Sequence, residues 1–131
     1  MRNTIKNRLG RIVKRADYRR IKRTGAVAVM PGLVLQAAFG NNKESSLGKR
    51  IGYTVSRKVG KAVIRNKARR RLKSVASDVL TKDGVKSLDY VVIGRAGTIT
   101  RTYDQLVRDM QMAIDKIDKS GQLIKKKVKN G

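Results

Sequence analysis

A basic segment in the middle of the chain constrains its fold more than any other feature. Residues 57–73 hold nine Lys and Arg in seventeen positions and no carboxylate. Apolar residues in and beyond this segment step by threes and fours. At 100° per residue they fall within an arc of about 120°: Ile64, Ala68, Leu72, Val75, Ala76 and Val79. We therefore predict a helix from Gly60 to Leu80 that packs along one stripe. A folded helix with this much positive charge needs a polyanion as partner.

The rest of the composition narrows the possible functions. The 131 residues fit one domain with a modest core, and 33 Lys and Arg against nine Asp and Glu give a net charge of +24. The chain has no Cys and no His, which excludes disulfides, thiolate metal sites and imidazole general-base catalysis. No apolar stretch approaches the roughly 18 residues of a membrane span, and the basic start lacks a signal-peptide core. We expect a soluble, cytoplasmic protein without a membrane partner.

The remaining periodicity predicts one α+β domain over residues 1–120. We expect a basic arm over 1–15, a helix over 17–23, strands over 27–30, 33–39 and 50–56, the long helix, a strand over 90–93, and a last helix with a capping box at Thr102 and Gln105. A polar turn is expected at 40–46, another turn at Asp83, and a disordered basic tail over 121–131. These elements form two layers, a four-stranded sheet with helices packed on it. The hand of any βαβ crossover stays open.

The residues offer little for catalysis by the protein itself. Asp78, Asp83 and Asp89 fall at ends of elements, where acids serve as caps and turn formers. No phosphate-loop spacing is present, and no catalytic or metal-binding residue is predicted. Nucleic-acid binding fits better, because cations grip phosphates and an exposed tyrosine can stack on a base. Tyr53 and Tyr90 lie in apolar alternation that favours the core, so Tyr18 is the better candidate. No DNA-binding motif is evident, and structured RNA is the expected partner.

Arg65 has an unusual position on the predicted helix. Its angle places it among the apolar side chains, near Leu72 and Ala76. Two interpretations remain open. The side chain either reaches back over the sheet for a functional contact, or it extends its charged end to water from a frayed first turn.

Residues 51–73 closely resemble the signature of the bacterial ribonuclease P protein subunit. The segment starts with Ile51-Gly52-Tyr53, includes Val59-Gly60-Lys61-Ala62-Val63-Ile64-Arg65-Asn66 and ends in the basic helix at Lys73. The likeness extends over about residues 11–118 and includes Asp17-Tyr18 and the strand that starts at Asp89. It implies an αβββαβα fold with a left-handed βαβ crossover. It also implies an RNA-binding cofactor of ribonuclease P, the endoribonuclease that removes the 5′ leader from precursor tRNA. In that family the RNA subunit carries the catalysis and uses magnesium ions, and the protein itself binds no cofactor.

The resemblance also assigns site residues. The surface for the RNA subunit comprises Arg57, Lys58, Lys61, Arg65, Asn66, Lys67, Arg69, Arg70 and Lys73. The leader cleft comprises Tyr18, Lys22, Gln36 and Arg65. Lys67 stands where the family usually has arginine, and it lacks the guanidinium fork. Lys22 and Gln36 stand where aromatic residues are common, so more of the leader affinity should come from charge.

The implied partners are the catalytic RNA and precursor tRNA, with no protein oligomer in the complex. Two other functions compete with this one. A ribosomal or nucleoid structural protein could use a similar basic domain, and a stand-alone nuclease would cleave RNA without an RNA subunit.

Overall fold

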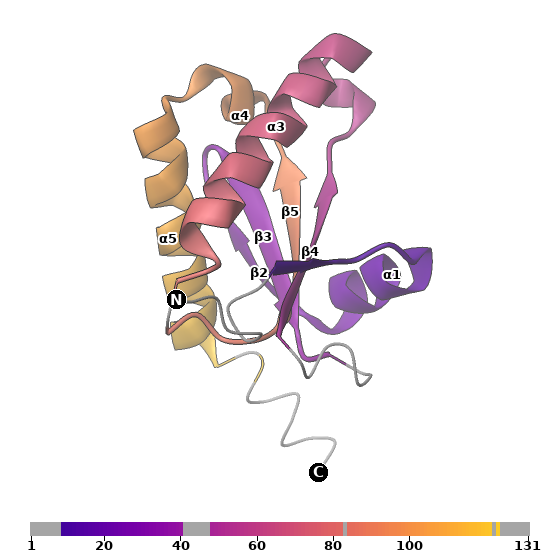
Figure 1. Ribbon diagram of the computed structural model, residues 1–131, viewed down its shortest axis with the longest axis vertical. Helices are drawn as coiled ribbons and strands as arrows, with labels where there is room; N and C mark the ends of the chain where they lie inside the picture. Colours follow the sequence, from indigo (N-terminus) through magenta and orange to yellow (C-terminus); the bar gives the residue numbers. More distant parts are fainter. Residues whose placement is uncertain (1–8, 41–47, 83, 122, 124–131) are drawn as a thin grey trace.

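The computed structural model describes residues 9–40, 48–82, 84–121 and 123, and Figure 1 shows the arrangement of its elements. In chain order these are β1 (Leu9–Arg11), α1 (Arg15–Thr24), β2 (Ala26–Val29), β3 (Leu33–Ala38), β4 (Lys49–Thr54), the 3-10 helix η2 (Arg57–Val59), α3 (Ala62–Val79), β5 (Asp89–Gly94), α4 (Ala96–Thr100) and α5 (Tyr103–Ser120). β1, η2 and α4 are short elements beyond those predicted. Residues 1–8 of the predicted arm, positions 41–46 of the predicted turn, Asp83, and positions 122 and 124–131 of the predicted tail lie outside the described residues.

The strands form one mixed sheet in the order β1-β4-β5-β3-β2. β1, β4 and β5 run parallel, and β3 and β2 continue the sheet in antiparallel pairs. The α+β class is confirmed, but the sheet has five strands where we predicted four. The fifth, β1, comes from the predicted arm and is too short to show apolar alternation. Backbone pairing along the edge of β4 forms it, and the N–H of Ile12 extends that pairing to the carbonyl of Ile51 at 2.9 Å.

α3 connects two neighbouring parallel strands, β4 and β5. Figure 1 shows α3 in front of the sheet, both strands pointing upward, and β5 to the left of β4. The crossover is therefore left-handed, against the strong usual preference for the right hand, and the expectation drawn from the resemblance is met.

The main core lies between one face of the sheet and helices α3 and α5. Alternate residues of β3 enter it, namely Leu33, Leu35 and Ala37. The predicted stripe of α3 is buried from Ala68 to Val79, but Ile64 is 39% exposed. The first turn of α3 extends past the end of the sheet in Figure 1, so its apolar residues have no strand to pack on. At the other end of the domain, Leu123 of the predicted tail is buried in this core.

The opposite face of the sheet is covered only in part. α1 packs there over a small cluster of buried residues: Ile12, Ile21, Ala38 and Val91. Beyond α1 the same face stays open, and the β2 residues Val27 and Val29 are 47% and 57% exposed. The sheet therefore has one closed face, which stabilises the fold, and one face that is partly accessible.

Candidate nucleic-acid interface

The predicted RNA-contacting residues lie along one exposed surface of η2 and α3. Gly60, with φ of +154°, joins the two helices in a backbone conformation that side chains disfavour. Seven of the nine predicted residues are exposed: Arg57, Lys58, Lys61, Asn66, Lys67, Arg70 and Lys73. Arg65 and Arg69 are half-buried, and Arg69 Nη1 donates to Asn66 Oδ1 at 3.1 Å. Folding thus gathers these cations on one helix surface, away from the buried stripe.

Arg65 turns toward the start of its own helix. Its Nε donates to the carbonyl oxygen of Gly60 at 3.1 Å, and the side chain is half-buried. The guanidinium is therefore held against the turn that precedes α3. Among the described residues, no hydrogen bond or ion pair joins Arg65 to the other predicted cleft residues, Tyr18, Lys22 and Gln36.

Tyr18 packs against the open face of the sheet. Its hydroxyl donates to the carbonyl oxygen of Ile12 at 3.2 Å, and the ring is half-buried. A Cβ atom added to Gly52 of β4 would lie 2.4 Å from Tyr18 Oη and 2.6 Å from Cζ. Glycine at position 52 is therefore what lets the ring approach the strand so closely.

Gln36 shares that open face, whereas Lys22 extends from α1 into solvent. Gln36 is half-buried in β3 and pairs in register with Val27 of β2 and Val91 of β5. Lys22 is exposed one turn after Tyr18. The structure thus places Tyr18 and Gln36 on one face and Lys22 at its margin.

The other two tyrosines of the strands belong to the closed face, as predicted. Tyr90 is buried in the main core, and its hydroxyl donates to the Lys86 carbonyl at 2.7 Å. Tyr53 packs against the same core, and Lys73 Nζ lies 6.0 Å from its ring centroid, at the limit of a cation–π contact. Burial, with a smaller contribution from Tyr18, raises the pKa of Tyr53 to about 12.

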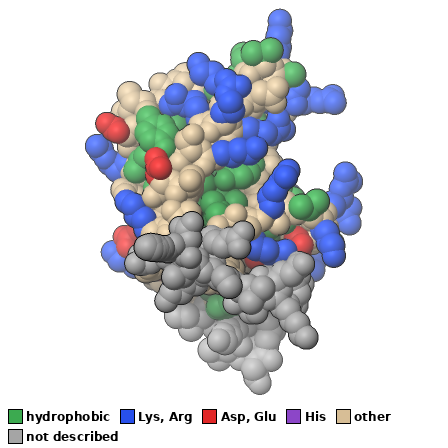
Figure 2. Space-filling view, in the orientation of Figure 1, with side chains coloured by type: hydrophobic (Ala, Val, Ile, Leu, Met, Phe, Trp, Pro, Cys, Tyr) green, Lys and Arg blue, Asp and Glu red, His purple; other side chains and the backbone are tan. Residues whose placement is uncertain are grey.

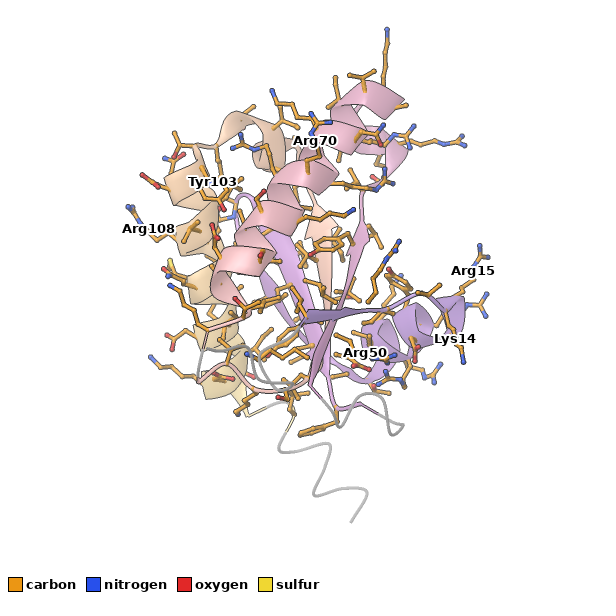
Figure 3. All side chains as sticks on the ribbon, in the orientation of Figure 1. Lys14, Arg15, Arg50, Arg70, Tyr103 and Arg108 are labelled. Carbon is orange, nitrogen blue, oxygen red and sulfur yellow. The ribbon has the colours of Figure 1, made fainter. Side chains whose placement is uncertain are left out.

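Positive side chains line both margins of an indentation in the molecular surface. Figure 2 shows Lys and Arg gathered over α3 and over α1, with the surface hollowed between them at the right of the view. Figure 3 places Arg70 on α3, and Lys14 and Arg15 at the start of α1. Lys14 and Arg15 were not among the predicted site residues, because only the fold brings the first helix opposite the long one.

A buried group of charges beneath α1 was also missed. Asp89, predicted as a cap or turn residue, is instead a fully buried strand residue. Arg50 Nε donates to its Oδ1 at 2.9 Å, Arg50 Nη2 to its Oδ2 at 2.7 Å, and Arg20 Nη2 to the same Oδ2 at 2.5 Å. Burial opposes ionisation of Asp89, but hydrogen bonds from both guanidinium groups outweigh it and hold the pKa below its usual range. The sequence signal for this pairing was the opposite charges of Arg50 and Asp89 at the starts of β4 and β5.

Two other polar residues of α3 serve the fold. Arg71 Nε donates to the carbonyl of Thr98 at 2.9 Å, and Arg71 Nη2 donates to the carbonyl of Arg101. Asp78 accepts a hydrogen bond from the hydroxyl of Tyr103, which Figure 3 labels on α5. Both contacts tie α3 to the C-terminal helices and direct these side chains away from the basic surface.

The described ranges contain no group of three carboxylate, Cys or His side chains that could hold a metal ion. None of the helices in the same ranges has both the length and the hydropathy of a membrane span.

Comparison with known proteins assigns the chain to a family. A family model described as Ribonuclease P matches residues 2–118. The ribonuclease P protein component of Paramagnetospirillum magneticum is 41% identical over 84% of each chain, and that of Gluconacetobacter diazotrophicus is 40% identical over 84% of this chain and 92% of its own.

Solved structures agree with these sequence relationships. The RNase P protein of Staphylococcus aureus aligns with a TM-score of 0.66 at 28% identity, over 83% of this chain and 94% of its own. The RNase P protein of Thermotoga maritima aligns with a TM-score of 0.60 at 25% identity, over 77% and 91% of the two chains. Because the family model covers most of the chain and relatives above 30% identity span over two thirds of it, the chain belongs to the family of bacterial ribonuclease P protein components.

Proposed function

We propose that this chain acts as the protein cofactor of ribonuclease P. It binds the catalytic RNA subunit and the 5′ leader of precursor tRNA, and it aids the endonucleolytic cut that produces the mature tRNA 5′ end. The observation that carries this proposal is the pairing of a folded cationic helix surface with a partly open sheet face bearing Tyr18. The names of the relatives support it.

The RNA subunit is proposed to bind along η2 and α3. Exposed cations there can contact successive phosphates. The electrostatic contribution of these contacts to binding does not depend on base sequence and weakens as the salt concentration rises. Lys67 would contribute as a point charge, whereas Arg70 can form a bidentate contact with one phosphate. Asn66 accepts a hydrogen bond from Arg69, which supports the orientation of that guanidinium.

The leader is proposed to lie over the open face of the sheet. Tyr18 would stack on one unpaired base, a contact worth about 1–3 kcal/mol. Lys22 can contact a leader phosphate from α1, and the Gln36 amide can form hydrogen bonds from the sheet. Arg65, held at the start of α3, would act where the two surfaces meet.

Catalysis is proposed to reside in the RNA subunit. The described residues contain no fitting metal-ligand group, so no step is assigned to a protein-bound metal, and magnesium enters through the RNA. One protein copy is proposed to act without a protein partner, because a net charge of +24 makes close self-association unfavourable without counter-charge.

Reconstitution tests the proposal. The purified chain is added to bacterial ribonuclease P RNA and precursor tRNA at low magnesium, where we expect stimulated cleavage and no cleavage by protein alone. Arg70→Ala should weaken stimulation more than Arg108→Ala. Both residues are exposed and each substitution removes one positive charge, but Figure 3 shows Arg108 on α5, away from α3.

Two outcomes would favour the competing functions. Absence of stimulation, together with tight binding to ribosomes or DNA, would indicate a structural protein. Cleavage of RNA by the chain alone, in a preparation free of contaminating nuclease, would indicate a stand-alone enzyme.

A further inference from the structure

The buried charges beneath α1 lie between the helix and the start of two strands. We propose that Asp89 is a positioning residue for leader binding, acting through Arg20 and Arg50 to fix where α1 and Tyr18 lie on the sheet. This inference rests on the proposed leader contact of Tyr18. Neither Asp89 nor the two arginines belong to the surfaces assigned above.

Asp89 connects the sheet to the helix through a single carboxylate. Its side chain has no exposed surface, and its neighbour in register on β4 is Arg50, which binds both carboxylate oxygens. Arg20 reaches the same carboxylate from α1 at 2.5 Å. One acid on β5 therefore holds a cation from each of two other elements.

Arg20 is the link that extends to the helix. Besides Asp89, its Nη1 donates to the carbonyl of Phe39 at 2.7 Å, so α1 is tied to β5 and to the end of β3 at once. Its Nη2 also lies 3.4 Å from Oδ1 of Asp17, the residue before Tyr18. The Nε of Arg20 is buried without a hydrogen-bond partner among the described residues. The side chain thus satisfies its terminal nitrogens at the expense of Nε.

Asp17 completes the group from the other side. Its Oδ2 lies 3.6 Å from Arg50 Nη2, so the helix turn that carries Tyr18 contacts the charges directly. Among the described residues, this group therefore contains two carboxylates and two guanidinium groups. The side chains of Arg20 and Arg50 are only 15% and 10% exposed, which keeps both out of the cationic surface available to RNA.

The apolar contacts of α1 are too few to orient it by themselves. The helix has ten residues, and Ile21 is its only buried apolar side chain, packed over a cluster of small area. Apolar contacts are non-directional, whereas hydrogen-bonded charges specify an angle. A buried ion pair is weak evidence for stability, and orientation is a better-supported role for it. Tyr18 then meets the sheet at one defined position.

The test compares leader-dependent affinity in reconstituted holoenzymes. The dissociation constant is measured for precursor tRNA with a one-nucleotide leader and for precursor tRNA with a long leader. The first value divided by the second gives the ratio that reports the leader contact. Asp89→Asn and Arg20→Met should each reduce this ratio by about tenfold, the order of one lost base stack. Affinity for the RNA subunit and for the short-leader substrate should stay unchanged. Asp115→Asn, an exposed acid on α5, is the matched control for the amide substitution.

Further variants separate positioning from folding and from direct contact. Arg20→Met keeps the Arg50–Asp89 pair, so it can replace Asp89→Asn in the test if the Asp89→Asn protein does not fold. Arg20→Lys keeps the positive charge and should restore part of the ratio that Arg20→Met loses. The Tyr18→Ala, Arg20→Met double variant should be no worse than Tyr18→Ala alone, because both changes remove the same stack. Multiplying effects would show that Arg20 binds the leader itself and would overturn the inference.

The remaining outcomes distinguish the two levels of the proposal. If Tyr18→Ala reduces the ratio while folded Asp89→Asn and Arg20→Met proteins retain it, the positioning role is wrong and the leader contact stands. If Tyr18→Ala itself leaves the ratio unchanged, the proposed leader contact fails, and the positioning role fails with it.

Discussion

Replacing Arg65 or Arg71 by alanine removes the same charge from the same helix, but the first change should mainly weaken RNA binding and the second should mainly lower stability. Both residues lie on α3 and both are half-buried. Among the described residues, the Arg65 side chain donates one hydrogen bond, to the carbonyl of Gly60, beside the proposed RNA surface. The Arg71 side chain donates two, to the carbonyls of Thr98 and Arg101, and these hold α4 and the start of α5. The two variants therefore lose the same long-range electrostatic attraction to RNA and differ only in the local contacts that they remove.

The expected magnitudes follow from these bonds. A hydrogen bond from a charged donor contributes about 1.5–3 kcal/mol, and partial exposure favours the lower end. Arg71→Ala should then cost about 3 kcal/mol of unfolding free energy and Arg65→Ala about 1.5 kcal/mol. At roughly 3 °C per kcal/mol for a domain of this size, Tm should fall by about 9 °C and about 4.5 °C respectively. Arg65→Ala should weaken binding to the RNA subunit about tenfold, equivalent to about 1.4 kcal/mol. Arg71→Ala should stay within about twofold.

Thermal unfolding followed by circular dichroism measures the fall in Tm. Equilibrium binding to the RNA subunit, at a temperature well below both Tm values, measures the loss of RNA affinity. Arg108→Ala reports the effect of one lost charge far from α3. Equal losses of RNA affinity for Arg65→Ala and Arg71→Ala would refute the reasoning, because only total charge would then matter. A larger loss of Tm for Arg65→Ala would refute the structural role of Arg71.

Three further predictions concern the open face, the buried charges and the basic surface. Gly52→Ala should displace the Tyr18 ring, lower stability by about 1–3 kcal/mol through overpacking, and reduce leader-dependent affinity in the same assay that tests Tyr18→Ala. Asp89 has a lowered pKa, so its contribution to stability is present above the ordinary carboxyl pKa and is lost as pH falls below about 4. Acid titration of unfolding free energy should therefore be steeper for the wild type than for Asp89→Asn, and equal slopes would contradict the pairing with Arg50. Arg70→Ala should reduce the slope of log affinity for the RNA subunit against log salt by about 0.7–0.9, the value for one phosphate contact, whereas an unchanged slope would remove Arg70 from the interface.

Features with strong periodicity could be predicted from the sequence. The buried stripe of α3 from Ala68 to Val79 and the alternation of β3 each reflect burial of one face of a regular element. The capping box at the start of α5 is local as well. Thr102 Oγ1 accepts from the Gln105 N–H at 3.1 Å, and Gln105 Oε1 accepts from the Thr102 N–H at 3.0 Å. Ile64 shows where prediction from periodicity fails. It continues the apolar spacing of α3, but the sheet has already ended at that point and the side chain stays exposed.

Features that depend on tertiary contacts could not be predicted in this way. α4 is a short helix rich in Thr and Gly, and it is held by Thr98, whose hydroxyl donates to the Gly32 carbonyl at 2.6 Å, and by Arg71. The partners of Asp89 depend on the register of β4 against β5 and on the placement of α1. Of the proposed site, the basic surface of α3 could therefore be predicted from residue types, but the placement of the α1 cations beside the surface hollow could not.

The attachment of the N-terminal elements has a consequence for the order in which the domain is built. β1 and α1 leave the ribosome before the other described elements, yet β1 pairs with β4, and Arg20 binds Asp89, sixty-nine positions later in the chain. Contacts of such separation form only after long loops have closed. The β2–β3 pair and α3, by contrast, can form from neighbouring residues. Although β1 and α1 are synthesised before the other described elements, they are thus among the last to dock. The part of the domain that carries Tyr18 can reach its final position only after β5 has been synthesised.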